Sequence, residues 1–138
     1  MPKLVFFYGT LMTPFNRPGR MRIDSQLTFK GHGSIAAALF DLGMYPAAVP
    51  ADHDTSRVRG EIYQMINAAD VLAVLDEIEG YRSTEPDTSL YTRRLTPVTL
   101  DDGRIVSAWA YFYNAPLGRA ERIDLGDYLE YLRRAGAR

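Results

Sequence analysis

The sequence predicts an α+β fold built on one curved or barrel-like β-sheet. The strand-like runs come mostly in succession, without the regular alternation with helices that a doubly wound parallel sheet requires. Helical patterns are confined to residues 68–80 and to the C-terminal residues 124–138. The run 105–114 is mostly apolar on both faces, which indicates a strand covered on both sides, as in a barrel packed by helices.

The length and composition fit one domain over residues 1–138. A chain of 138 residues can bury roughly two thirds of the surface that it exposes when unfolded. Apolar residues make up 46% of the sequence and charged residues 24%, with a formal net charge of -1. This balance argues against intrinsic disorder and against binding to nucleic acid.

The side chains that usually bind metals are scarce. Cysteine is absent, which excludes thiol nucleophiles, disulfides and thiolate metal sites. His32 and His53 are the only histidines, and neither has a second histidine at ligand spacing, so we expect no metal and no cofactor. No segment has the apolar length that would span a bilayer. We expect a cytoplasmic protein without membrane partners, whose oligomeric state the sequence leaves open.

The strand predictions follow from short apolar runs between turns rich in glycine and proline. Residues 3–8 form a first strand with many branched and aromatic side chains, and a loop over residues 12–20 follows it. Residues 27–42 form either two strands or one strand bent at a bulge, with His32 exposed at a barrel corner. The other predicted strands are residues 45–50, 58–65, 90–100 and 105–114, the last two joined by an Asp-Gly hairpin turn.

The helix that Asn67 can cap and Gly80 can end carries one carboxylate on its apolar face. With residues placed about 100° apart around the helix axis, Glu79 falls inside the apolar arc. Asp76 and Glu77 fall outside it. The arc itself consists of Val71, Leu72, Val74, Leu75 and Ile78.

Glu79 is therefore a candidate acid or base. Burial among apolar side chains and the negative end of the helix dipole both favour its protonated form, which should raise its pKa toward the range useful for proton transfer. Two alternatives remain open: the helix frays before Glu79, or Arg82 or Arg93 neutralises the carboxylate. Glu85, in the loop over residues 81–90, is a rival base if that loop folds inward.

The segment that ends the first strand is a candidate binding loop. It consists of Tyr8, Gly9, Thr10 and Leu11. Gly9 lets the backbone turn so that successive N–H groups converge, and such a concavity can hold an anion or a developing oxyanion. Thr10 adds a hydroxyl group to the same loop. A plain turn without a ligand is the alternative.

Seven short motifs follow one another along most of the chain. They are FFYGTLM at residues 6–12, LFDLGMYPAAVP at 39–50, VRGEIYQM at 58–65, LDEIEGY at 75–81, YTRR at 91–94, AWAYFYN at 108–114 and IDLGDY at 123–128. In this order the chain resembles the gamma-glutamylcyclotransferase-like superfamily, including its gamma-glutamylamine cyclotransferase and AIG2-like branch. The resemblance implies a small mixed β-barrel with flanking helices, in agreement with the α+β fold predicted above.

The resemblance also implies an activity and its residues. In the family a Y-G-[ST]-L loop contacts the glutamyl group of the substrate. Here that loop corresponds to Tyr8, Gly9, Thr10 and Leu11, and the family's acid/base glutamate corresponds to Glu79. The implied reaction cyclises the gamma-glutamyl group of a small molecule to 5-oxoproline and releases an amine or amino acid. Because the substrate supplies the nucleophile, this reaction requires no cysteine, metal or cofactor.

Three further residues are candidates for substrate binding: Tyr91, Arg93 and Tyr113. A tyrosine hydroxyl can donate a hydrogen bond to the oxyanion or close the pocket. Arg93 can hold a substrate carboxylate or, alternatively, pair with Asp87 at the surface. The sequence does not identify the leaving amine. The alternative function is a non-catalytic protein that binds a small metabolite or a partner and retains the same fold.

Overall fold

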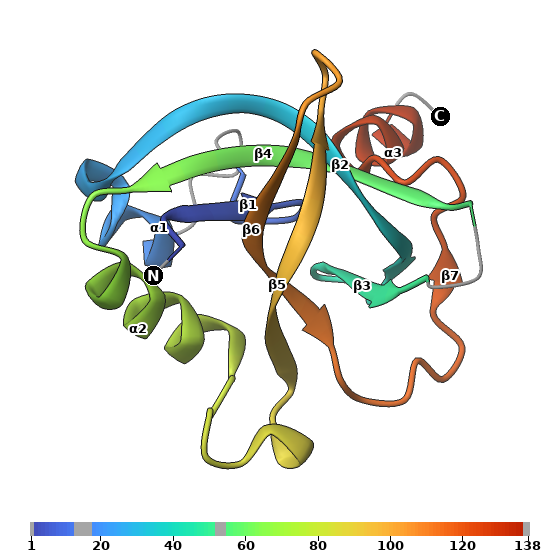
Figure 1. The fold of residues 1–138 in the computed structure, drawn as a ribbon. Helices are drawn as coiled ribbons and strands as arrows, with labels where there is room; N and C mark the ends of the chain where they lie inside the picture. Colours follow the sequence, from blue (N-terminus) through green and yellow to red (C-terminus); the bar gives the residue numbers. More distant parts are fainter. Residues whose placement is uncertain (1, 13–17, 52–54, 137–138) are drawn as a thin grey trace.

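The computed structural model describes residues 2–12, 18–51 and 55–136, and its centre is a closed β-barrel (Figure 1). Five strands form the barrel in the order β2, β4, β1, β6 and β5, and β5 pairs back with β2 to close it. Their bounds are Leu4–Phe7 for β1, Leu27–Asp41 for β2, Arg57–Met65 for β4, Tyr91–Leu100 for β5 and Ile105–Tyr113 for β6. β1 and β6 are parallel and the other barrel pairs are antiparallel, so the predicted mixed barrel is confirmed.

β1 lies in the middle of the barrel wall and of the hydrophobic core. It pairs with β4 on one side and with β6 on the other. Val5, Phe6 and Phe7 are at most 2% exposed, as expected for a strand without polar alternation that is covered on both faces. The chain leaves this strand at Tyr8, which is also buried.

β2 is one continuous strand with a bend. A bulge between Phe29 and Gly31 interrupts its pairing with β4, so the bent-strand alternative is confirmed. His32, next to this bulge, is exposed as predicted, whereas His53 lies outside the described residues. The C-terminal part of β2 pairs with two short strands outside the barrel, β3 (Pro46–Pro50) and β7 (Glu121–Arg122).

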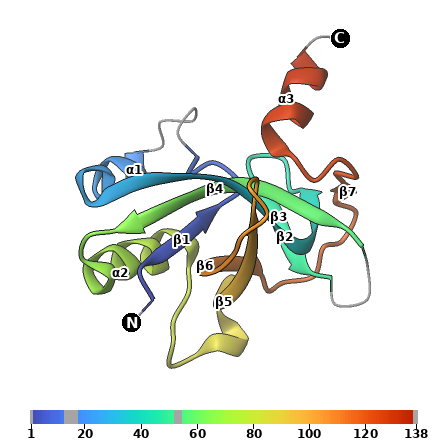
Figure 2. The ribbon, with the colours of Figure 1, turned by 45° about the horizontal axis from the view of Figure 1, so that its top comes forward.

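Helices flank the barrel at α1 (Pro18–Met21), α2 (Ala68–Glu79) and α3 (Tyr128–Gly136). α2 and α3 lie on opposite sides of the barrel (Figures 1 and 2). α1 is a single turn that begins in the segment 12–20 predicted as a loop, so that prediction is wrong at its C-terminal end. Most of that loop, residues 13–17, lies outside the described residues. None of the helices in the described part of the chain combines the length and apolar character needed to cross a membrane.

α2 has the predicted caps at both ends. The Asn67 side chain accepts a hydrogen bond from the Asp70 amide at 3.3 Å. Gly80 adopts the left-handed conformation with φ 68° and ψ 37°, and the Tyr81 amide donates to a carbonyl of the last turn at 2.9 Å. The helix therefore extends to Glu79, and the alternative that it frays before this residue is wrong.

Candidate active site

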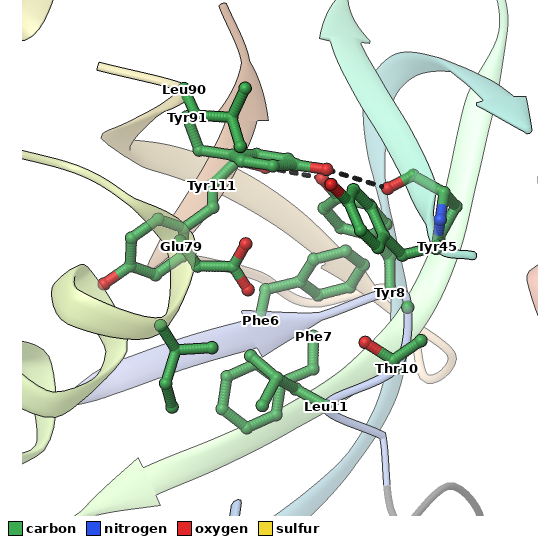
Figure 3. Close-up of a pocket in the computed structure, with 13 residues that line it drawn as sticks. Phe6, Phe7, Tyr8, Thr10, Leu11, Tyr45, Glu79, Leu90, Tyr91 and Tyr111 are labelled. Atoms are coloured by element: carbon green, nitrogen blue, oxygen red, sulfur yellow. Dashed lines mark hydrogen bonds between the residues drawn. The ribbon is translucent and has the colours of Figure 1, made fainter. Parts of the chain in front are cut away.

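A pocket of about 100 Å³ opens where the ends of β1 and α2 meet the start of β5 (Figure 3). The residues that line it are Phe6, Phe7, Tyr8, Gly9, Thr10, Leu11, Tyr45, Pro46, Ile78, Glu79, Leu90, Tyr91 and Tyr111. The structure thus brings the candidate binding loop and Glu79 to the same space, although the two are far apart in the sequence.

A tight turn shapes the loop side of the pocket. The Met12 amide donates a hydrogen bond to the Gly9 carbonyl oxygen at 3.0 Å, which closes a turn over residues 9–12. A turn of this kind does not itself use the amide N–H groups of its two central residues, Thr10 and Leu11. Both residues line the pocket.

The reason for a glycine at position 9 differs from the one expected. Gly9 is not among the glycines with positive φ, so the turn does not depend on its conformational freedom. A Cβ atom at this position would lie 2.8 Å from Cγ of Pro46 in β3, which is closer than real side chains approach. Gly9 therefore allows β3 to pack against the loop, and this contact sets the shape of the pocket wall.

Among the described residues that line the pocket, Glu79 carries the only carboxylate. Its half-buried side chain points from the last turn of α2 toward Phe6 and Tyr8 (Figure 3). The two arginines considered as its neutralising partners have other carboxylate partners. Arg82 pairs with Glu85 at 3.2 Å, and Arg93 pairs with Asp76 at 2.9 Å.

Two tyrosines of the pocket use their hydroxyl groups to hold the main chain. The Tyr8 hydroxyl donates to the Tyr111 carbonyl oxygen at 2.7 Å and accepts from the Ala48 amide at 3.3 Å. The Tyr91 hydroxyl donates to the Pro46 carbonyl oxygen at 3.1 Å (Figure 3). The bonds to Ala48 and to Pro46 fasten β3 to the barrel. These phenols therefore act in the structure as parts of the pocket wall.

The phenol of Tyr8 remains protonated at neutral pH. Burial raises its pKa well above the usual value, and the neighbouring Tyr91 and the negative charge of Glu79 raise it further. The hydrogen bond from the Ala48 amide acts in the opposite direction but is the weakest of these influences. The Tyr8 phenolate is therefore not a base in this pocket.

The sequence analysis did not predict two of the tyrosines that line the pocket, Tyr45 and Tyr111, nor five apolar lining residues: Phe6, Phe7, Pro46, Ile78 and Leu90. Tyr111 lies in β6 directly across from Arg93 of β5, and its hydroxyl donates to Oδ1 of Asp76 at 2.5 Å. Burial is the main cause that raises the pKa of Tyr111, and the hydrogen bond to Asp76 raises it further. The only sequence signal for Tyr111 was its place in the aromatic motif at residues 108–114, which does not reveal the register between β5 and β6.

Arg93 and Tyr113, predicted to contact the substrate, are not among the residues that line the pocket. Arg93 forms a two-point ion pair with Asp76, and its guanidinium lies over the Trp109 ring at 4.5 Å. Arg93 therefore pairs neither with Asp87 at the surface nor with a group inside the pocket. Tyr113 packs edge-on against Tyr91, with 5.3 Å between the ring centroids. Each of them instead lies next to a residue that lines the pocket, Arg93 next to Tyr111 and Tyr113 next to Tyr91.

The loop after α2 does not bring a second base into the pocket. Glu85 is exposed and pairs with Arg82, so the rival assignment of Glu85 as the base is wrong for this structure. The loop is held by Ser89, whose hydroxyl accepts from the Arg82 amide at 2.8 Å and donates to the Glu85 carbonyl oxygen at 2.9 Å. Only Leu90, at the end of the loop, lines the pocket together with Tyr91.

A barrel with a side pocket, in which one carboxylate faces a main-chain turn, defines a domain that can enclose a small molecule beside an acid or base. The chain belongs to the family described as Gamma-glutamyl cyclotransferase, AIG2-like, whose model matches residues 5–130. The resemblance inferred from the sequence motifs is thereby confirmed.

Individual relatives agree with this family. The chain is 30% identical over 127 residues to the gamma-glutamylcyclotransferase family protein YtfP of Escherichia coli K12, with coverage of 91% of this chain and 96% of that one. The solution structure of ytfP from Escherichia coli matches with a TM-score of 0.63 at 31% identity, over 93% of this chain and 97% of that chain.

A more distant structure shares the fold. The crystal structure of YkqA from Bacillus subtilis matches with a TM-score of 0.74 at 24% identity. All of this chain is covered, but it spans only 44% of the length of YkqA. An AIG2-like protein from Mus musculus matches with a TM-score of 0.59 at 23% identity, over 83% of this chain and 79% of that one.

Proposed function

We propose that the protein is a gamma-glutamylcyclotransferase that acts on small molecules carrying a gamma-glutamyl group. The α-amine of the glutamyl group attacks the carbonyl carbon of its own side chain. A new C–N bond closes the five-membered ring of 5-oxoproline, and the original C–N bond to the leaving amine breaks. The family membership and the names of the relatives support this class of reaction.

In this proposal Glu79 moves the proton. Its carboxylate accepts a proton from the α-ammonium group, which frees the nitrogen lone pair for attack. Its carboxylic acid then gives the proton to the leaving nitrogen as the tetrahedral intermediate collapses. The ring nitrogen passes its second proton to the departing amine, which leaves as an ammonium ion. General acid–base catalysis of this kind typically contributes 10²–10⁴-fold to the rate. The supporting observation is that Glu79 and the turn over residues 9–12 border one pocket.

The turn binds the glutamyl group. In this proposal the main chain of the turn supplies hydrogen-bond donors to the substrate oxygen that gains negative charge during attack, because Gly9, Thr10 and Leu11 line the same pocket as Glu79. Tyr8 and Tyr91 donate their hydroxyl protons to main-chain carbonyls, so we assign them to the wall. The enclosed shape would hold the glutamyl chain in the folded form that places its amine near its own carbonyl.

The test is production of 5-oxoproline by the purified protein. Gamma-glutamyl amino acids and gamma-glutamyl amines are offered separately, and 5-oxoproline and the released amine are quantified. Glu79→Gln should lower kcat/KM by about 10²-fold or more. Glu77→Gln is the matched control, because Glu77 lies on the same helix but is exposed and outside the pocket, and it should change kcat/KM less than about twofold.

Two results would refute parts of this proposal. Full activity of Glu79→Gln would remove Glu79 as the proton carrier while leaving the reaction intact. Binding of these compounds without any 5-oxoproline would instead identify the protein as the non-catalytic metabolite-binding alternative.

A further inference from the structure

We infer that Asp76, Arg93 and Tyr111 form a positioning network that fixes Glu79 at the edge of the pocket; this inference rests on the proposed role of Glu79. The network joins three elements that are separate in the sequence, because Asp76 belongs to α2, Arg93 to β5 and Tyr111 to β6. None of its polar groups is required for the chemistry itself.

The geometry concentrates three donors on one carboxylate. Arg93 Nε donates to Oδ1 of Asp76 at 2.9 Å, and Arg93 Nη2 donates to Oδ2 at 3.2 Å. The Tyr111 hydroxyl donates to Oδ1 at 2.5 Å. Arg93 and Tyr111 are direct cross-strand neighbours in the β5–β6 pair, so the register of this hairpin aims both at Asp76. Two-point arginine–carboxylate pairs restrict orientation more than a single contact does.

Arg93 also holds the chain on the other side of Glu79. Its guanidinium lies 5.5 Å from the ring centroid of Tyr81, two residues after Glu79, and 4.5 Å from that of Trp109. The Tyr81 amide donates to the Asp76 carbonyl oxygen at 2.9 Å. The segment from Asp76 to Tyr81 is thus fastened at both ends to the same arginine, with Glu79 between them.

The network is largely buried, which strengthens its hydrogen bonds. The side chains of Arg93 and Asp76 are 17% and 20% exposed, so water competes weakly for their hydrogen bonds. The ring of Tyr111 lines the pocket, whereas its hydroxyl points out of it toward Asp76. The network therefore fixes one wall of the pocket and the carboxylate beside it with the same set of bonds.

The first experiment compares Arg93→Lys with Arg59→Lys. Arg59 is a matched control, because it forms a two-point pair with Asp101 at 2.9 Å but lies outside the pocket. Lysine keeps the positive charge but lacks the planar guanidinium that binds a carboxylate at two points. Arg93→Lys should lower kcat tenfold to a hundredfold with KM changed less than about threefold, since small misplacements of a reacting group cost this much. Arg59→Lys should leave both constants within about twofold of wild type.

The second experiment removes only the Tyr111 hydroxyl. Tyr111→Phe keeps the ring that lines the pocket and should lower kcat with little change in KM. The matched control is Tyr131→Phe, which removes a comparable hydroxyl donated to Oδ2 of Asp41 at 2.7 Å, away from the pocket. This pair keeps the test decisive if Arg93→Lys does not fold.

A third measurement does not depend on turnover. The ¹⁵N relaxation order parameter of the Glu79 amide should fall from about 0.85 in the wild type to about 0.6 in Arg93→Lys and should not change in Arg59→Lys. If the wild type produces no 5-oxoproline, the proposed function fails, and this measurement still decides on the network. Equal effects of Arg93→Lys and Arg59→Lys on kcat, or an unchanged order parameter, would overturn the inference.

Discussion

Two carboxylates of α2, Asp76 and Glu79, lie about one helical turn apart and have opposite surroundings. The Asp76 carboxylate accepts two hydrogen bonds from the Arg93 guanidinium and one from the Tyr111 hydroxyl. Glu79 faces a pocket that also contains a main-chain turn. Both side chains are partly buried, so burial alone does not separate a structural acid from a candidate catalytic one. Their places in the structure separate them, because Asp76 is fixed by Arg93 and Tyr111 whereas Glu79 lines the pocket.

The largest expected effect is a difference in stability between these two positions. Asp76→Asn should lower the free energy of unfolding by about 3 kcal/mol, because it leaves the largely buried Arg93 guanidinium without its ionic partner. Glu79→Gln should lower it by less than about 1 kcal/mol. Urea unfolding of both variants measures the difference. Equal losses would contradict the division between a structural and a functional carboxylate.

A smaller effect is expected on the loop side of the pocket. Gly9→Ala places a Cβ atom against Pro46 and should cost about 1–3 kcal/mol of stability through overpacking. The displaced β3 also changes the pocket wall, so kcat/KM should fall. Gly136→Ala is the control, because a Cβ there meets no atom within 4 Å. Thermal unfolding and 5-oxoproline assays of both variants would show whether the Pro46 contact matters.

The end of α2 gives a third, milder test. Gly80→Ala forces a Cβ into a left-handed conformation and should destabilise the protein by about 1 kcal/mol. Gly80→Asn should cost less, since asparagine tolerates this conformation. A hydrogen-exchange measurement should show faster exchange near Glu79 in Gly80→Ala than in Gly80→Asn. The reverse order would mean that the left-handed cap does not hold the last turn.

The smallest effect is expected far from the pocket, at Glu130 in α3. Hydrogen bonds from Arg133 and then Arg134 lower the pKa of Glu130 to about 2. Because the folded-state pKa lies below the ordinary value of 4.5, the stabilisation is complete above pH 4.5 and is lost as the pH falls toward 2. Glu130→Gln should lower Tm by at most about 2 °C at pH 7. The difference should disappear near pH 2, and 5-oxoproline production should not change.

Local patterns were sufficient for much of the fold. The caps of α2 and the two-sided burial of β1 follow from residue types over a few positions, whereas the bulge in β2 was one of two alternatives that the sequence left open. The inward direction of Glu79 follows equally from helical periodicity. The α+β barrel could be predicted because the order of strands and helices excludes a regular parallel sheet.

The partners of individual side chains could not be predicted in this way. The helical wheel placed Asp76 on the outer face of its helix, yet Asp76 is the centre of the network with Arg93 and Tyr111. Arg93 was expected at a substrate or at the surface, and Gly9 was explained by backbone freedom instead of by its contact with Pro46. Each of these outcomes depends on a residue that is distant in the sequence.

The sequence by itself determined the five barrel strands, β3, α2 and α3, where α2 ends and which way Glu79 points, but it did not predict α1 or β7. These properties depend on periodicity and on the conformational preferences of neighbouring residues. Only the tertiary structure decided that β3 packs on Gly9, that the β5–β6 register aims Arg93 and Tyr111 at Asp76, and that the turn after β1 meets Glu79 at one pocket. The physical reason is that strand register and barrel closure bring together residues whose contacts no local pattern encodes.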